Sequence, residues 1–176
     1  MINTIVIFGA SGDLTRRKLI PALYELHRKK RLPGELLIVG MARTEYSRDQ
    51  WREILKEACM AQVGKHFDPS LWEEFAKNIY YHPGDVSRAE CFPELDKFVS
   101  ELENHQPSTR IYYLALAPEF YECTIAHLGA AGMASESSGP RRIVVEKPFG
   151  RDRESARQLN AKIHEVFAEH QIYRID

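Results

Sequence analysis

Apolar residues along this chain gather in five short runs, which are separated by longer segments with helical spacing. The runs are nearly continuous rather than alternating. Continuous runs are typical of strands in a parallel sheet whose two faces are both covered. We therefore predict strands at Thr4–Phe8, Leu36–Gly40, Ile79–His82, Ile111–Ala115 and Ile143–Glu146.

The segments between these runs carry apolar residues three and four positions apart, as one face of a helix requires. Helices are predicted at Asp13–Lys30, Arg48–Gln62, Pro69–Lys77, Arg88–Asn104, Pro118–Ala131 and Arg153–Glu169. In the first of them, Pro21 is expected to kink the helix or to begin a second segment. Alternating strands and helices predict a Rossmann-like α/β fold, a doubly wound and mostly parallel sheet in three αβα layers. The 176 residues are enough for one such domain.

The first apolar run turns into the first helix through two glycines. Gly9 permits a tight turn, and Gly12 has no Cβ to obstruct the close approach of a phosphate. Free backbone N–H groups at the N-terminus of a helix bind anions such as a pyrophosphate. We therefore predict that this turn binds a dinucleotide cofactor through Gly9, Ser11, Gly12, Asp13 and Leu14.

The residue that follows the second strand distinguishes NAD from NADP in this fold. An acid there binds the ribose 2′-hydroxyl of NAD, whereas an arginine accommodates the 2′-phosphate of NADP. Arg43 stands in this place, and a guanidinium pairs with phosphate through two hydrogen bonds. Ser11 can add a hydroxyl to the same phosphate, so we favour NADP. The alternative is that Arg43 is a solvated residue beside Glu45.

Two further strand ends carry candidate binding residues, because ligands of such sheets bind beyond the carboxyl ends of the strands. After the fourth predicted strand, the segment with Ala117, Pro118 and Tyr121 is expected to line the cofactor near its nicotinamide. After the fifth, Glu146 and Lys147 emerge from a buried strand, where charged side chains are rare without a partner.

Glu146 can accept a hydrogen bond from the nicotinamide carboxamide, and Lys147 can donate to an oxyanion or to a substrate hydroxyl. Pro148 makes the preceding peptide bond a candidate for the cis form, which would aim Lys147 into the site. The alternative is a surface salt bridge followed by a proline that only forms a turn.

Composition excludes several other classes of function. The 24 Lys and Arg against 25 Asp and Glu give a net charge of −1, which provides no attraction to nucleic acid or to an acidic membrane. No apolar run approaches the roughly 20 residues of a membrane span, and the first strand leaves no room for a secretory signal. The three cysteines and seven histidines show no metal-ligand spacing. We expect a cytoplasmic protein with reduced thiols and no metal.

Taken together, the motifs make the chain resemble the N-terminal coenzyme domain of the glucose-6-phosphate dehydrogenase family. The first half of the resemblance rests on residues 9–14 (Gly-Ala-Ser-Gly-Asp-Leu), 17–19 (Arg-Lys-Leu) and 42–43 (Ala-Arg). The second half rests on residues 113–118 (Tyr-Leu-Ala-Leu-Ala-Pro), 146–150 (Glu-Lys-Pro-Phe-Gly) and 173–176 (Tyr-Arg-Ile-Asp). These motifs span essentially the whole chain in the order of the family.

The resemblance implies NADP-dependent oxidation of glucose 6-phosphate at C1 to 6-phosphogluconolactone, the first step of the pentose phosphate pathway. It implies that Lys147 contacts the sugar and that Pro148 couples the coenzyme and substrate sites. It also implies that Asp176 orients and charges a histidine, the general base that takes the proton of the C1 hydroxyl.

In the family, the motif Arg-Ile-Asp continues into His-Tyr-Leu-Gly-Lys and then into a large β+α domain that holds the catalytic histidine. The full-length enzymes form homodimers or tetramers. None of these segments follows Asp176 here, so we expect residues 1–176 to be an NADP-binding domain that is inactive alone. Two alternatives stay open: a short non-catalytic NADP-binding or regulatory module, and an NAD(P) oxidoreductase of another family with the same fold.

Overall fold

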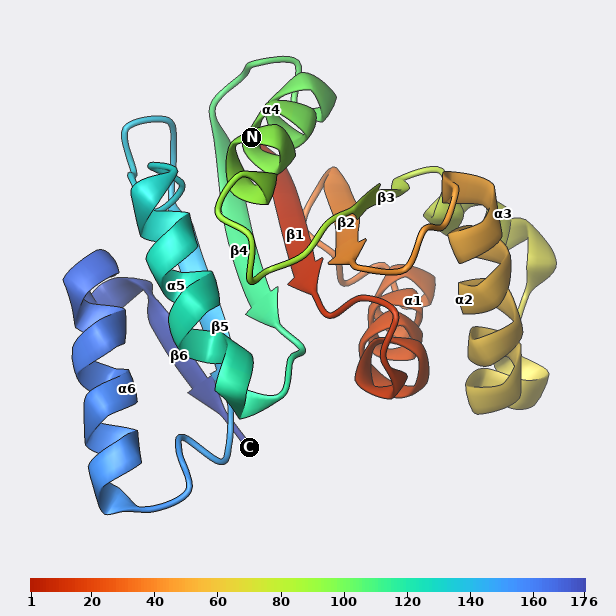
Figure 1. The fold of residues 1–176 in the computed structure, drawn as a ribbon. Helices are drawn as coiled ribbons and strands as arrows, with labels where there is room; N and C mark the ends of the chain where they lie inside the picture. The colour runs from red at the N-terminus through yellow and green to blue at the C-terminus, as the bar shows by residue number, and fades with distance from the viewer.

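The computed structural model describes residues 1–176 and contains one six-stranded sheet (Figure 1). The strand order is β3-β2-β1-β4-β5-β6, and every neighbouring pair is parallel. The strands are β1 (Ile2–Phe8), β2 (Leu36–Ala42), β3 (Ile79–Pro83), β4 (Ser108–Leu114), β5 (Arg141–Glu146) and β6 (Ile172–Ile175). The direction of winding reverses between β1 and β4, which confirms the predicted doubly wound fold. The carboxyl ends of all six strands meet at one edge of the sheet.

Helices cover the two faces of the sheet in separate groups, which confirms the three predicted layers (Figure 1). On one face lie α1 (Ile20–Arg28), α2 (Arg48–Val63) and α3 (Pro69–Ala76). On the other face lie α4 (Cys91–Leu102), α5 (Tyr121–Ala130) and α6 (Arg153–Val166). Four short helical segments complete the chain: η1 (Thr15–Leu19), η2 (Gly64–His66), η3 (Pro118–Phe120) and η4 (Glu169–Gln171).

Two apolar clusters fill the space between the sheet and its helices. One joins α1, α2 and α3 to the sheet around Tyr24, Trp51 and Trp72, all of which are buried. The other joins α4, α5 and α6 to the opposite face around Phe8 and Tyr112. A fully buried Phe or Leu side chain contributes about 1.5–3 kcal/mol. The clusters therefore fix the position of the sheet relative to its helices.

Local signals account for the helix boundaries. The first helical segment opens with five residues of π-helix and continues as α1, in whose first turn Pro21 lies. Proline fits there because a first-turn N–H has no acceptor within the helix, so Pro21 begins a second segment, one of the two predicted outcomes. Ser47 caps α2: its hydroxyl accepts from the Gln50 N–H at 3.1 Å, and the Gln50 side chain accepts from the Ser47 N–H at 2.8 Å.

Several predicted boundaries were wrong. α4 begins at Cys91 rather than at Arg88, and α6 ends at Val166 rather than at Glu169. β4 begins at Ser108, earlier than the predicted Ile111. The strand β6 was not predicted at all, because it is only four residues long and two of them, Tyr173 and Arg174, are exposed. A short edge strand of this kind lacks the apolar run by which the other strands were recognised.

The prediction that both faces of every strand are covered is right for β2 and wrong for β4 and β5. All seven residues of β2 are buried. In β4 and β5, buried residues alternate with half-buried ones, and the half-buried residues include Tyr113, Val144 and Glu146. The helices α5 and α6 cover one face of these strands, and the other face is left partly open.

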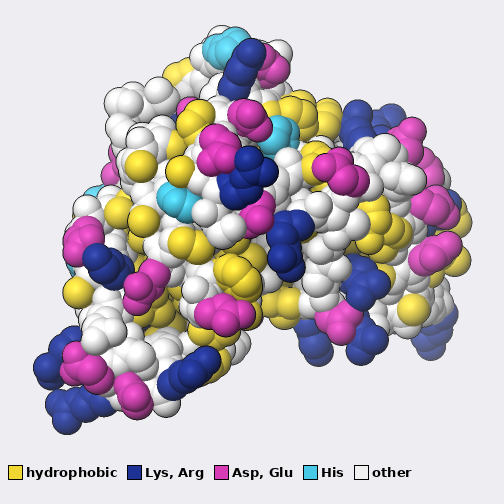
Figure 2. Space-filling model, viewed as in Figure 1, with side chains coloured by type: hydrophobic (Ala, Val, Ile, Leu, Met, Phe, Trp, Pro, Cys, Tyr) yellow, Lys and Arg dark blue, Asp and Glu magenta, His cyan; other side chains and the backbone are white.

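Charged side chains of both signs are interspersed over the face of the molecule that Figure 2 shows. No helix in the structure is both long enough and apolar enough to span a membrane. No three His, Cys, Asp or Glu side chains are grouped so that they could hold a metal ion. Cys59, Cys91 and Cys123 are free thiols.

Candidate functional site

The glycine turn lies directly after β1, at the carboxyl edge and in the middle of the strand order. The N–H groups of Gly9 and Ala10 both donate to the carbonyl oxygen of Met41, at 3.0 and 3.1 Å, which ties the turn to the end of β2. Gly9 has φ +81°, and a Cβ there would overlap the carbonyl oxygen of Ala115, next to the end of β4. Only glycine fits at this position between the two neighbouring strands.

The turn presents a row of backbone donors. The N–H groups of Ser11, Asp13, Leu14 and Thr15 make no hydrogen bond within the chain. The Thr15 hydroxyl and Nε of Arg16 are buried and also lack a partner. A buried polar group without a hydrogen bond costs free energy, so an acceptor in this place stabilises the turn. Phosphate oxygens match such a set of donors.

A cleft of about 240 Å³ opens beside this turn. It is lined by Gly9, Ser11 and Gly12 of the turn, by Arg43 after β2 and by Ala117 after β4. Arg43 is exposed, and its guanidinium makes no ion pair or hydrogen bond within the chain. The fold therefore brings five of the predicted cofactor residues to one cavity, with a free guanidinium on its wall.

The cleft has a third wall that the sequence pattern did not predict, the segment that follows β3. Gly84, Asp85 and Val86 line it. Hydrogen bonds from Ser87 hold the pKa of the Asp85 carboxyl below its ordinary value, and the charge of Arg43 lowers this pKa further. The signal was present in the sequence, since a Gly-Asp pair closely follows a predicted strand and parallel strands end at the same edge.

A second cavity, of about 720 Å³, adjoins the first at Ala117, which lines both. Pro118, after β4, and Pro148, after β5, line the second cavity. The peptide bond between Lys147 and Pro148 is cis. The two strand-end segments that the sequence singled out thus face a common space.

Glu146, the last residue of β5, is held by a tyrosine of β4. The Tyr113 hydroxyl donates to Oε1 of Glu146 at 2.5 Å. Burial raises the pKa of the Tyr113 hydroxyl, and the bond to Glu146 raises it further, so this hydroxyl keeps its proton and donates. The Tyr121 hydroxyl donates to the main-chain oxygen of Glu146 at 3.4 Å. Oε1 of Glu146 is therefore fixed, whereas Oε2 accepts no hydrogen bond within the chain.

Lys147 forms an ion pair with Asp176, which follows β6. The Lys147 N–H also donates to the carbonyl oxygen of Ile175 at 3.1 Å, so the main chain joins the ends of β5 and β6. Both charged side chains are largely exposed, with accessible fractions of 59% and 80%. The unpredicted strand β6 is what brings Asp176 to Lys147.

Some of the predicted cofactor residues line neither cavity: Asp13, Leu14, Tyr121, Glu146 and Lys147. The free groups of Asp13 and Leu14 are their backbone N–H donors, and the Asp13 carboxylate pairs with Arg16 at 2.5 Å. Tyr121 is buried against the main chain of Glu146.

Comparison with known proteins gives a consistent result. A family model described as glucose-6-phosphate dehydrogenase, NAD binding domain, matches residues 6–176. Glucose-6-phosphate 1-dehydrogenase of Bacillus subtilis (strain 168) is 40% identical over 174 residues, an alignment that covers 98% of this chain and 34% of the relative. The chain spans about a third of the length of the curated relatives that it matches.

Solved structures agree with the sequence comparison. A structure described as glucose-6-phosphate dehydrogenase in complex with its substrate glucose-6-phosphate has a TM-score of 0.88 at 36% identity, covering 99% of this chain and 36% of that one. The glucose-6-phosphate 1-dehydrogenase of Mycobacterium avium has a TM-score of 0.86 at 35% identity, with the same coverage.

Proposed function

Because this chain belongs to the glucose-6-phosphate dehydrogenase family, as its NAD-binding domain, we propose that it binds NADP beside the glycine turn and serves the oxidation of glucose 6-phosphate at C1. The observation that carries the choice of NADP is the free guanidinium of Arg43, which lines the same cleft as Gly9 and Gly12. A phosphate on the adenosine ribose is the group that such a guanidinium binds through paired hydrogen bonds.

The residues present fit a dinucleotide with a 2′-phosphate. The unpaired N–H groups of residues 11 and 13–15 would hold the pyrophosphate. Arg43 and the Ser11 hydroxyl would bind the 2′-phosphate, and Ala117 with Pro118 would line the nicotinamide end. When bound, the nicotinamide supplies the hydride acceptor.

Three further residues, Glu146, Lys147 and Asp176, would orient the cofactor, the sugar and the catalytic base. Glu146, whose Oε1 is held by Tyr113, would accept a hydrogen bond from the carboxamide of the cofactor. Lys147 donates to the sugar, and Asp176, its ion-pair partner, orients and charges the histidine that acts as general base. No histidine within residues 1–176 hydrogen-bonds to Asp176. The proposal therefore assigns the base to a segment outside these residues.

Calorimetric titration with NADP and with NAD tests the choice of cofactor. We expect the chain to bind NADP at least about tenfold more tightly than NAD. Arg43→Ala should lower the affinity for NADP by about 10- to 100-fold and leave that for NAD unchanged, because hydrogen bonds to a charged group contribute about 1.5–3 kcal/mol. Arg31→Ala, which removes an exposed cation before β2, should change neither affinity. Tighter binding of NAD, or unchanged NADP affinity in Arg43→Ala, contradicts the proposal.

The oxidation is tested by adding glucose 6-phosphate and NADP and following the absorbance of the reduced cofactor. We expect no turnover by residues 1–176 alone. We expect turnover by a protein in which they are joined to the second domain of the family, and a fall in kcat/KM of about 100-fold or more in its Lys147→Ala variant. Turnover by residues 1–176 alone would show that the base lies within them. Binding of NADP without turnover in the longer protein would favour a non-catalytic module.

A further inference from the structure

A pair of arginines lies at the amino edge of the sheet, opposite the cofactor cleft. Arg110, in β4, and Arg141, the first residue of β5, are partners in the strand register. Both are buried, with 4% and 5% of their surface accessible. Two buried cations side by side are costly unless each is paired with an acid.

Arg110 is fully paired. Its Nη2 and Nε donate to the buried carboxylate of Glu103 at 2.7 and 3.0 Å, and its Nη1 donates to Asp96 at 2.6 Å. Nη2 also donates to the hydroxyl of Ser100 at 2.9 Å. The carboxylates of Glu103 and Asp96 thus both accept hydrogen bonds from Arg110.

The guanidinium of Arg141 has no carboxylate partner, although the backbone N–H of this residue donates to Oε1 of Glu136 at 3.1 Å. Its Nη1 donates to the carbonyl oxygens of Ser108 and Pro140, at 2.6 and 3.1 Å. Nε and Nη2 make no hydrogen bond within the chain, and neither is sealed from solvent. Burial lowers the pKa of the Arg141 guanidinium, and the charge of Arg110 lowers it further. Glu103 and Asp96 act on this charge only from a distance, so the Nε–Nη2 edge of Arg141 is left without an acceptor.

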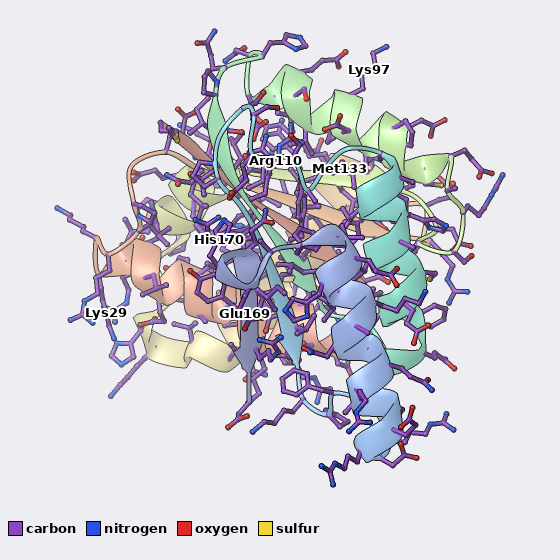
Figure 3. The ribbon with its side chains drawn as sticks, turned by 90° about the vertical axis from the view of Figure 1, so that its left-hand side faces the viewer. Lys29, Lys97, Arg110, Met133, Glu169 and His170 are labelled. Atoms are coloured by element: carbon purple, nitrogen blue, oxygen red, sulfur yellow. The ribbon has the colours of Figure 1, made fainter.

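Arg141 lines a polar cavity of about 350 Å³. The cavity is bordered by β4, by the end of α4 and by the loop that precedes β5, which contributes Ser135, Ser137 and Ser138. Arg110 and Met133, which also line it, lie close together in Figure 3. A water molecule occupies about 30 Å³, so the space admits a small anion together with several waters.

We propose that this cavity is a binding site for a small oxyanion, a phosphate ion or a terminal phosphate group, held by the Nε–Nη2 edge of Arg141 and the hydroxyls of the serine loop. That edge presents two parallel N–H donors, the arrangement that matches two oxygens of a phosphate. The site lies at the edge of the sheet opposite the glycine turn, and the proposal does not depend on the proposed cofactor or substrate.

Nuclear magnetic resonance of the isotopically labelled chain tests the site directly. Inorganic phosphate is titrated at constant ionic strength while the side-chain Nε–H resonances of Arg141 and Arg110 are followed. We expect the Arg141 resonance to shift and to saturate, whereas the Arg110 resonance stays in place because Glu103 already occupies its Nε–H. Acetate, with one charge, should bind about tenfold more weakly than phosphate.

Two variants complete the test. Arg141→Met should abolish the saturable shifts of the loop amides at residues 135–138. Should that variant fail to fold, Ser138→Ala, at an exposed loop position, should weaken phosphate binding several-fold. An Arg141 resonance that does not move, or one that moves linearly without saturation, overturns the proposal. NADP binding, measured separately, tests only the proposed cofactor site beside the glycine turn, so the two proposals can fail independently.

Discussion

Gly9 is the residue at which the backbone requirement of the site can be tested most simply. It has φ +81°, and a Cβ would overlap the Ala115 carbonyl. Gly132 has a similar φ of +72°, but nothing lies within 4 Å of a Cβ there. We expect Gly132→Ala to lower the free energy of unfolding by about 1–2 kcal/mol, the cost of a left-handed conformation. Gly9→Ala should lower it by more and should weaken NADP binding as well, because the turn must move.

Urea unfolding of both variants and calorimetry with NADP measure these effects. An equal loss of stability in Gly9→Ala and Gly132→Ala would mean that only the φ angle matters and that the turn has room to adjust. At this scale the sequence predicted the tight turn at Gly9, because the backbone conformation there requires glycine, whereas the role of Arg43 in binding the cofactor stays a prediction. The sequence did not reveal Asp85 or Arg141, because their roles depend on what is packed beside them.

At the scale of elements, the buried acid Glu103 joins α4 to two strands. Its side chain is 2% exposed and accepts from the Thr4 hydroxyl of β1 at 2.7 Å and from Arg110 of β4. Glu103→Gln should lower the free energy of unfolding by about 3–5 kcal/mol, because it leaves the Arg110 charge buried without its main partner. Asp96→Asn removes a 39% exposed partner of the same arginine and should cost about 1 kcal/mol or less.

Denaturant unfolding of the two variants side by side checks this difference. Equal losses, or a negligible loss in Glu103→Gln, would show that the pair contributes no more than a surface salt bridge. The order of the elements could be predicted from the sequence because each of five strands is an apolar run bounded by helical spacing. The strand β6 could not, since its pairing with β5 rather than its composition makes it a strand.

At the scale of the whole molecule, stability depends on pH through a buried thiol and a buried tyrosine hydroxyl, which lose their protons only in strong base. Burial raises the pKa of the Cys59 thiol from 9.0 to about 12, and that of the Tyr81 hydroxyl from 10.0 to about 12. The unfolded chain thus loses these protons at a lower pH than the folded chain does. The resulting stability is fully present below pH 9.0 and is lost as the pH rises toward about 12.

We therefore expect the free energy of unfolding to fall above pH 9.0, by up to about 1.4 kcal/mol per pH unit for each of these groups. Unfolding measured from pH 8 upward, on the unaltered chain and on Cys59→Ala, checks this. In Cys59→Ala the free energy of unfolding should fall less steeply with pH. The cavity that the substitution leaves lowers stability by the same amount at every pH, so it does not affect this slope. Identical slopes would exclude Cys59 as a contributor.

The sequence by itself determined the fold class, the glycine turn and the strand-end residues Arg43, Glu146 and Lys147. These follow from local chemistry: apolar runs form strands, glycine permits the turn, and parallel strands place whatever follows them at one edge. Only the tertiary structure decided that Tyr113 holds Glu146, that Asp176 pairs with Lys147 and that the Arg141 guanidinium is buried without a carboxylate in contact. Each of these depends on which strands are neighbours, and contacts between distant segments are set by packing rather than by local pattern.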